Sequence, residues 1–377
     1  MPTLPPLIAA PAFDTHLLVS RAHDDAGLEI SRDTYDILAD PRFAGATMPP
    51  SLVGLARRTW NIDLAGMIMR RAVHVRPRTE LSYSSASYEL NLACDYACDH
   101  CYLGEKRNRS LPMAERETIL RTMAQAGVLR LQITGGEPLI DRHFEDCYRL
   151  AHELGMQVKI SSNGSMLWRP KILALLTELP PVRVSLSMYG ATAASYESLT
   201  NTRSGTFTRF ERGVEVAIEA GIPLRVNVIV TRHNQDEAAL MEARCAEWGV
   251  PHYVYGRMTP TFNGDGKVLG AQATSINLTR RRPVFPGCDA GNSYFHVDPL
   301  GRASICKVGR EPNVMLHHEG LDGLRRLPAI AKSLLARDGD CSGCSIQAGC
   351  STCPVIVRNY RRAAASPSFF CNHAKKE

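Results

Sequence analysis

Three cysteines in one short loop are the residues best suited to chemistry in this sequence of 377 residues. Cys94, Cys98 and Cys101 form a CxxxCxxC motif with no fourth cysteine nearby. Iron–sulfur clusters are normally held by four thiolates, so three thiolates leave one iron of a four-iron cluster open. An open iron can bind a small molecule. Taken alone, the motif also fits a partial zinc site or three incidental thiols.

A glycine-rich turn follows one strand later. Residues 129–134 predict a strand that runs into Gly135, Gly136 and Glu137. Two glycines at a strand end let the backbone approach a ligand closely, and the Glu137 carboxylate can bind an ammonium group. Together the two motifs resemble the radical S-adenosylmethionine (SAM) superfamily. The resemblance implies that the open iron binds SAM, that the turn holds its methionyl amine, and that reductive cleavage releases a 5'-deoxyadenosyl radical.

Strands and helices alternate through the middle of the chain. Apolar runs rich in β-branched residues predict strands at 88–93, 129–134, 157–162, 182–187, 224–230 and 252–255. Helices are predicted between them at 141–154, 171–176, 207–220 and 236–248. This alternation predicts a parallel sheet. Six units fit the partial (β/α)6 barrel of the radical SAM family better than a complete eight-unit barrel.

Polar residues near the strand ends are further candidates for SAM contacts, because ligands of such barrels bind at the C-terminal ends of strands. The resemblance implies contacts from Tyr102, Asn163 and Ser187, and Arg203 is expected to meet the SAM carboxylate. Each could instead be an ordinary polar residue of a strand end or loop. No residue is assigned as catalytic; three are interpreted as wall residues, Tyr189, His252 and Tyr255.

Seven cysteines dominate the chain after residue 260, and their order resembles the SPASM domain, although one gap is a residue shorter than usual. The resemblance implies two auxiliary four-iron clusters, so that the chain would hold three 4Fe-4S clusters. The ligands would be Cys341, Cys344, Cys350 and Cys371 for an outer cluster and Cys288, Cys306 and Cys353 for an inner one. We expect an open iron or a non-cysteine ligand in the inner cluster. A zinc ribbon is the alternative for the paired CxxC steps.

Two cysteines lie outside these motifs. Cys147 and Cys245 fall in predicted helices, where buried inert thiols are expected. The alternative is that one of them donates a hydrogen atom to a substrate radical, as in radical SAM peptide epimerases.

The first 80 residues predict a small separate domain after a loose arm at residues 1–12. Residues 17–19 and 28–30 predict a hairpin. Ser31 is expected to cap a helix through residue 39 that buries Tyr35, Ile37 and Leu38. Two further helices are predicted, with their apolar residues at 52–56 and 64–71.

This winged-helix-like plan resembles the recognition domains fused to many peptide-modifying enzymes. In that family a leader peptide adds as an extra strand to the edge of the sheet. The alternative is a structural cap on the barrel.

Composition narrows the possible partners and location. A net charge of +6, without long basic runs, argues against nucleic-acid binding. The sequence has no apolar stretch of membrane-spanning length and no basic start typical of a signal peptide, so a cytoplasmic protein without a membrane partner is expected. In such a protein twelve cysteines indicate metal binding rather than disulfides.

The sequence therefore predicts a recognition domain at 1–80, a radical SAM partial barrel at 81–260 and a SPASM domain at 261–377. The expected function is maturation of a ribosomal precursor peptide through hydrogen abstraction and an intramolecular crosslink, with flavodoxin or ferredoxin as electron donor. The alternatives are a radical SAM peptide epimerase, or a dehydrogenase or epimerase of a small molecule such as an aminocyclitol. A maturase of a folded protein and an iron–sulfur or zinc protein without turnover also remain open.

Overall fold

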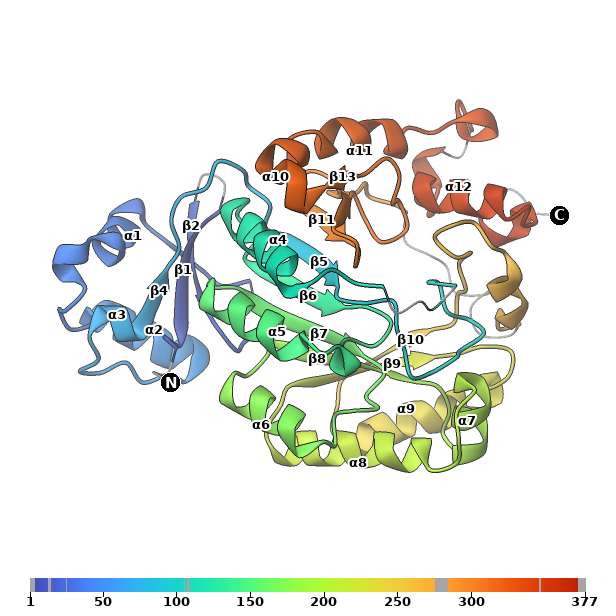
Figure 1. Ribbon diagram of the computed structural model, residues 1–377, viewed down its shortest axis with the longest axis horizontal. Coiled ribbons are helices and arrows are strands. Elements are labelled where there is room, and N and C mark those ends of the chain that lie inside the picture. Colours follow the sequence, from blue (N-terminus) through green and yellow to red (C-terminus); the bar gives the residue numbers. More distant parts are fainter. Residues whose placement is uncertain are drawn as a thin grey trace.

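The computed structural model describes residues 4–12, 15–24, 26–104, 106, 109–274, 284–345 and 347–371. Within them, strands form a four-stranded sheet near the N-terminus and a nine-stranded sheet through the rest of the chain (Figure 1). None of the helices in these ranges has the length and apolar character needed to cross a membrane.

Six consecutive parallel strands form the centre of the large sheet. Each pairs with the next in chain order, which confirms the predicted parallel sheet. The strands are β5 (Ser85–Glu89), β6 (Arg130–Thr134), β7 (Gln157–Ser162), β8 (Arg183–Met188), β9 (Leu224–Ile229) and β10 (His252–Tyr255). The first strand ends at Glu89, earlier than predicted. Leu90 is still buried in the core, which explains why the apolar pattern continued past the strand.

Six helices alternate with these strands. They are α4 (Met113–Gln125), α5 (Phe144–Glu153), α6 (Pro170–Glu178), α7 (Ala193–Thr200), α8 (Thr206–Glu219) and α9 (Ala238–Glu247). The sequence analysis missed α4 and α7. The buried face of α4 includes Arg116, which is 1% exposed and paired with Asp141, so a charge interrupts its apolar pattern. Helix α7 begins with a capping box between Thr192 and Ser195 rather than with an apolar stripe.

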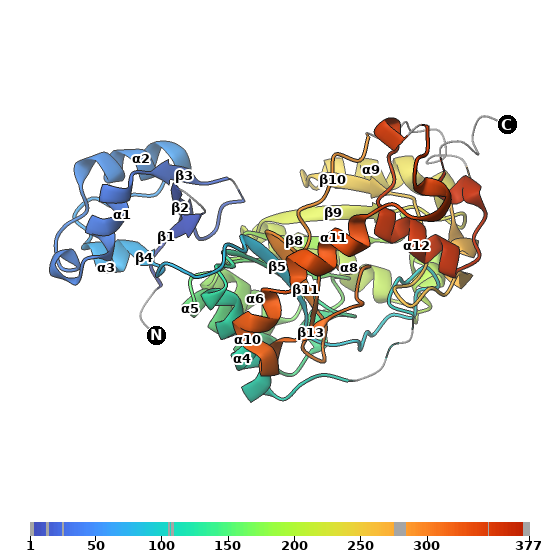
Figure 2. The same ribbon diagram turned by 90° about the horizontal axis from the view of Figure 1, so that it is seen from above.

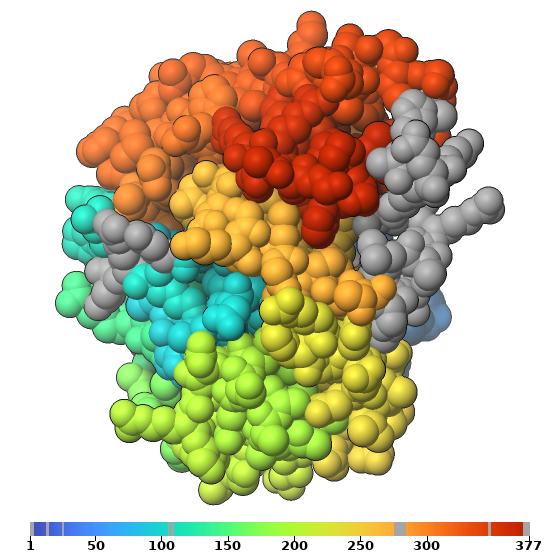
Figure 3. All heavy atoms as spheres, turned by 90° about the vertical axis from the view of Figure 1, so that its right-hand side faces the viewer, coloured from blue at the N-terminus to red at the C-terminus, as the bar shows by residue number. Residues whose placement is uncertain are grey.

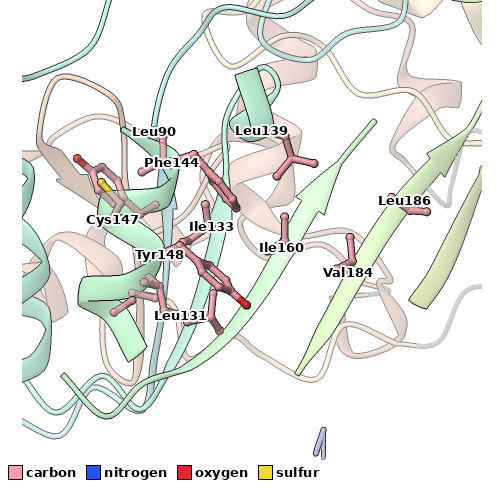
Figure 4. Packing of buried hydrophobic residues seen from close by; sticks show 14 of the residues in the cluster. Leu90, Leu131, Ile133, Leu139, Phe144, Cys147, Tyr148, Ile160, Val184 and Leu186 are labelled. Atoms are coloured by element: carbon pink, nitrogen blue, oxygen red, sulfur yellow. The ribbon is translucent and has the colours of Figure 1, made fainter. Parts of the chain in front are cut away.

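The core lies between the sheet and its helices. Figure 4 shows Ile133, Ile160 and Val184, from three neighbouring strands, beside Phe144 and Tyr148 of α5. All five side chains are at most 2% exposed. This packed layer holds the strands in register and so fixes where their C-terminal ends lie.

The C-terminal segment extends the same sheet. β11 (Tyr294–Val297) pairs in parallel with β5, and β12 (Arg302–Ser304) and β13 (Val314–Met315) follow as antiparallel strands. Three helices cover this part: α10 (Leu316–Leu324), α11 (Leu327–Leu335) and α12 (Pro354–Arg362). The six predicted units therefore correspond to β5–β10, and the partial (β/α)6 barrel stays a prediction.

The small sheet has the order β3-β2-β1-β4. Its strands are β1 (Leu7–Ala12), β2 (Thr15–Ser20), β3 (Leu28–Ile30) and β4 (Val73–Val75), and its helices are α1 (Arg32–Ala39), α2 (Pro50–Trp60) and α3 (Met69–Ala72). The hairpin and the Ser31 cap are confirmed, because β2 and β3 are antiparallel and the Thr34 amide donates to the Ser31 hydroxyl. The winged-helix-like description stays a prediction.

Three expectations for this segment were wrong. Residues 7–12 are a strand rather than a loose arm, because Leu7 and Ile8 on its two faces are both fully buried. Ile37 is 44% exposed, since the buried face of α1 is formed by Tyr35 and Leu38. The third helix starts only at Met69, so most of the predicted 64–71 segment precedes it.

The small sheet packs on the N-terminal ends of the central strands (Figures 1 and 2). Ile8, Ala10 and Val19 contact Leu129, just before β6. The Gln157 side chain, at the start of β7, donates to the Ser20 carbonyl over 2.6 Å. The N-terminal segment therefore covers the end of the sheet opposite to the one at which ligands of such folds bind.

Candidate functional site

A cavity of about 290 Å³ lies at the C-terminal ends of the central strands. Figure 3 looks at this end of the molecule, where the surface around the cysteine loop is cyan. The structure brings eight of the predicted site residues together in its wall: Cys94, Cys98, Cys101, Tyr102, Gly135, Gly136, Asn163 and Ser187. The volume is near the lower end of the range of small-molecule pockets. We call this the cysteine cavity.

The glycine turn is pressed against the cysteine loop. The Gly136 amide donates to the Asn91 carbonyl and the Glu137 amide to the Ala93 carbonyl, over 2.9 and 2.8 Å. A Cβ atom on Gly136 would lie 2.1 Å from the Ala93 oxygen. The second glycine is therefore required by the close approach of two backbones, and it fixes the turn beside the residue that precedes Cys94.

The three cysteines are half-buried in a loop whose intervening residues are partly exposed. Burial raises the pKa of Cys94 and of Cys98 to about 12, so both thiols are protonated at neutral pH unless a metal binds them. The Ala97 amide, between them, donates to the Thr200 carbonyl over 2.8 Å. Three thiols that face one cavity fit a four-iron cluster held by three protein ligands.

Glu137 is placed differently from the expectation. It is fully buried and does not line the cysteine cavity. Its carboxylate accepts hydrogen bonds from the Leu139 amide, the Ser162 hydroxyl and the Asn163 amide, over 2.9, 2.8 and 2.6 Å. Burial raises its pKa to about 8, although these hydrogen bonds lower it. In this structure Glu137 joins the ends of β6 and β7.

Arg203 also lies apart from the cysteine cavity. It is exposed and lines a neighbouring cavity of about 510 Å³. Among the predicted wall residues, Tyr189 lines the cysteine cavity, whereas the side chains of His252 and Tyr255 do not. Tyr255 is 47% exposed.

The sequence analysis missed three basic residues of this cavity. His100 lies inside the cysteine motif, with its ring 5.3 Å from that of Tyr189. Lys106 follows the motif closely in the sequence, and this proximity could have indicated it as a residue of the site. Lys307 comes from the C-terminal segment, and its ammonium group donates to the Gln132 side chain over 3.1 Å. Nothing in the local sequence around Lys307 indicated that it would reach the end of β6.

A buried ion pair lies behind the cavity. Glu89, at the end of β5, accepts two hydrogen bonds from Arg310, over 2.9 and 2.7 Å, and one from the Tyr102 hydroxyl over 2.9 Å. Burial alone would raise the pKa of Glu89, but His296 and Arg310 hold it well below its usual range. Because Arg310 comes from the C-terminal segment, this pair ties that segment to the cysteine motif.

The cysteines predicted for the inner auxiliary cluster are neighbours. Burial raises the pKa of Cys306, and the nearby Cys353 and Cys288 raise it further. Burial also raises the pKa of Cys353, and the nearby Cys288 raises it further. The donor chemistry of these three thiols fits an iron–sulfur ligand set.

Arginines contact the cysteines predicted for the outer auxiliary cluster. Arg361 donates to the Cys341 sulfur over 3.3 Å and Arg337 to the Cys350 sulfur over 3.6 Å. In the ranges that the structure describes, no group of three or more His, Cys, Asp or Glu side chains is arranged to hold a single metal ion. The assignment of all these cysteines to clusters stays a prediction.

Cys147 and Cys245 belong to the hydrophobic core. Both are fully buried, and neither lines the cysteine cavity. Figure 4 shows Cys147 among the core side chains of α5. Burial raises the pKa of Cys147 to about 12 and that of Cys245 to about 11. These surroundings favour the expected inert thiols.

Comparisons with known proteins bear on this site. Residues 88–244 match the model of the radical SAM superfamily. The chain is 28% identical to mycofactocin maturase MftC of Mycobacterium ulcerans over 243 residues, which are 59% of this chain and 63% of that protein. It is also 28% identical to the AdoMet-dependent heme synthase of Methanosarcina barkeri over 289 residues, 73% of this chain and 78% of that protein. The matches to the mycofactocin maturases thus span about three fifths of those proteins' length.

The fold has a counterpart among solved structures. Streptococcus suis SuiB, solved in complex with its precursor peptide SuiA, superposes with a TM-score of 0.59 at 14% identity, covering 93% of this chain and 95% of that chain. At this identity the likeness concerns the fold alone. The superfamily match runs from the end of β5 into α9 and includes the three cysteines and the glycine turn of the cavity. Residues 88–244 are therefore the part of the chain that resembles the radical SAM superfamily.

Proposed function

We propose that this protein is a radical SAM maturase of a ribosomal precursor peptide. The observation that carries the proposal is the cysteine cavity, where three thiols open toward the Gly135–Gly136 turn and the ends of β7 and β8. When bound, a four-iron cluster and SAM would together supply a 5'-deoxyadenosyl radical. That radical would abstract hydrogen from the peptide and lead to an intramolecular crosslink.

Different residues of the cavity would bind the cluster and SAM. Cys94, Cys98 and Cys101 would hold the cluster. The backbone of the glycine turn, Asn163 and Ser187 would position SAM, with Tyr102 fixed by its hydrogen bond to Glu89. Because Glu137 does not line the cavity, its carboxylate would have to move to reach the SAM amine. Arg203 would have to turn from its own cavity to reach the SAM carboxylate.

Two auxiliary clusters in the C-terminal segment would complete the cofactors. Cys288, Cys306 and Cys353 would hold the inner cluster with one open iron, and Cys341, Cys344, Cys350 and Cys371 the outer one. Lys307 directly follows Cys306 in the sequence and lines the cysteine cavity, so the chain that carries an inner ligand also reaches the wall of that cavity. This proximity supports a role for the inner cluster in removing the electron that bond formation leaves behind.

The peptide substrate is supported by the likeness to a mycofactocin maturase and to SuiB, which was solved with its precursor peptide. β3 is an edge strand of the small sheet, so a leader could add there as a further strand. That sheet lies at the opposite end of the central strands from the cysteine cavity. A six-residue strand such as β7 spans about 20 Å, so at least six extended residues would have to separate leader and target.

A small-molecule substrate is the second candidate. It is favoured by the match to the heme synthase, which covers more of this chain than the match to MftC does. The position of the N-terminal segment over the strand starts also suits a structural cap.

The test is the mass of the small peptide encoded beside the gene, after co-expression with the intact protein or with a Cys94→Ala, Cys98→Ala, Cys101→Ala variant. The proposal expects a loss of two hydrogens with the intact protein alone, located by fragmentation. A Cys147→Ala variant is the matched control, because that thiol is outside the cavity, and it should leave the product unchanged. A peptide whose mass is unchanged in ordinary water but which gains deuterium in heavy water would show epimerisation instead. No change, in a protein that cleaves SAM, would refute the peptide substrate.

A further inference from the structure

The cavity that contains Arg203 lies directly outside the cysteine loop. Asp95 and Tyr96, the two residues after Cys94, form part of its wall. Tyr96 also lines the cysteine cavity, so the loop is the partition between the two spaces. With about 510 Å³ this second cavity is the larger of the two. We call it the arginine cavity.

Three arginines give this cavity its charge. Arg169, Arg203 and Arg209 are all exposed. Arg169 lies over the Trp168 ring, and Arg209 donates to the Thr206 hydroxyl over 2.9 Å. Within the residues that the structure describes, none of the three forms an ion pair with a carboxylate.

The remaining polar groups of the wall offset only part of this positive charge. Asp95 is the only carboxylate of the lining, and it accepts a hydrogen bond from the Asn163 side chain over 2.8 Å. A concave, basic surface suits an acidic partner.

The place of this surface indicates what the partner does. Asn163 donates to Asp95 and also approaches the Cys94 sulfur, at 3.7 Å. A protein on this surface would come close to a cysteine ligand without entering the cysteine cavity, which SAM and substrate would fill. In Figure 3 the cyan surface around the loop is accessible beside the yellow-green segment that carries α7 and α8.

We propose that the arginine cavity docks a small acidic one-electron carrier protein of the flavodoxin type. The inference rests on the proposed function, because it assumes a cluster at Cys94, Cys98 and Cys101. One electron passes from the flavin hydroquinone, which becomes the semiquinone, to the oxidised cluster, which is reduced by that electron. No covalent bond forms or breaks. Redox encounters of this kind use small interfaces and depend on charge complementarity.

The test uses the reconstituted holoenzyme with Arg169→Glu and Arg209→Glu combined. The matched control is Arg70→Glu with Arg71→Glu, two exposed arginines of the N-terminal α3 that change the net charge equally. Stopped-flow measurement of semiquinone formation from flavodoxin hydroquinone gives the bimolecular rate constant. Photoreduced deazariboflavin, which is uncharged, reduces the same samples without docking. Calorimetry gives the Kd of oxidised flavodoxin for each protein.

At low ionic strength the cavity variant should lose about tenfold in the flavodoxin rate constant and in affinity, whereas the control stays within about twofold of the unmodified protein. The difference should shrink as salt is added. Reduction by deazariboflavin should be equal in all three. If the double glutamate variant does not fold, Arg169→Gln with Arg209→Gln should show a smaller loss in the same direction.

Equal flavodoxin rates and affinities in variant and control would overturn the docking surface. So would a variant that is reduced normally by flavodoxin but turns over peptide more slowly, because the cavity would then bind substrate. If the unmodified protein binds no iron, or cleaves no SAM with deazariboflavin, the proposed function fails. The affinities for flavodoxin would still decide on the surface in that case.

Discussion

The two ends of the central strands differ in what covers them. At the N-terminal ends, Gln157 donates to the Ser20 carbonyl, and Arg76 donates to the Val128 and Ala124 carbonyls, so the small sheet is bonded to the strand starts. At the C-terminal ends lie two cavities and three thiols. The comparison shows one end built for stability and the other left open for ligands, as in other parallel α/β folds.

The largest expected effect concerns the buried ion pair between Glu89 and Arg310 at the C-terminal ends of the strands. Arg310→Met would leave the Glu89 carboxylate without its guanidinium partner in a fully buried position. We expect the free energy of unfolding to fall by about 3–5 kcal/mol, measured by urea denaturation. The variant Glu89→Gln with Arg310→Met is the control, and it should recover much of the loss because no charge is stranded. A double variant as unstable as the single one would show that the pair is not the cause.

The N-terminal ends of the central strands, which the small sheet covers, form the closed end. We expect acid to lower the free energy of unfolding through His152 at this end. Burial lowers the pKa of His152 to about 3, from an ordinary 6.5, and Arg21 nearby lowers it further. Between these values the unfolded chain binds a proton that the folded chain does not, so stability is lost as the pH falls below 6.5. At pH 5 the loss from this histidine is about 2 kcal/mol.

The measurement is urea denaturation of the intact protein and of His152→Leu at pH 7 and pH 5. Both ring nitrogens of His152 lack partners among the described atoms, so the substitution removes no described hydrogen bond of the ring. The variant should lose about 2 kcal/mol less than the intact protein between the two pH values. Equal losses would place the acid sensitivity elsewhere.

The smallest expected effect on stability concerns partly exposed ion pairs at the N-terminal ends of the central strands. Asp24 forms ion pairs with Lys159 and Arg183, at 2.6 and 2.7 Å, and all three side chains are 25–28% exposed. Asp24→Asn should lower the free energy of unfolding by about 1 kcal/mol or less, and 1 M salt should reduce the difference. Asp36→Asn, at the more exposed pairs with Arg32 and Arg78, is the control and should cost less still. A cost for Asp24→Asn well above 1 kcal/mol would show that the Asp24 ion pairs are more tightly coupled than their exposure indicates.

Local patterns predicted much of the fold and part of the site. The strand at 157–162 matches β7 in full, and the cysteine motif and glycine turn meet in one cavity. Helix α4 was missed because Arg116 interrupts its apolar face. β1 was missed because its proline- and alanine-rich residues suggest a loose arm, whereas burial between the small domain's helices and Leu129 keeps it in the sheet.

The sequence by itself determined the elements and the chemistry, since strand periodicity and the spacing of cysteines are properties of neighbouring residues. Only the tertiary structure decided which distant groups meet. It brought Lys307 and Arg310 from the C-terminal segment to the ends of β5 and β6, turned the Glu137 carboxylate toward β7, and placed Arg203 outside the cysteine cavity. The reason is physical: long-range contacts depend on how whole elements pack, and no local pattern records that packing.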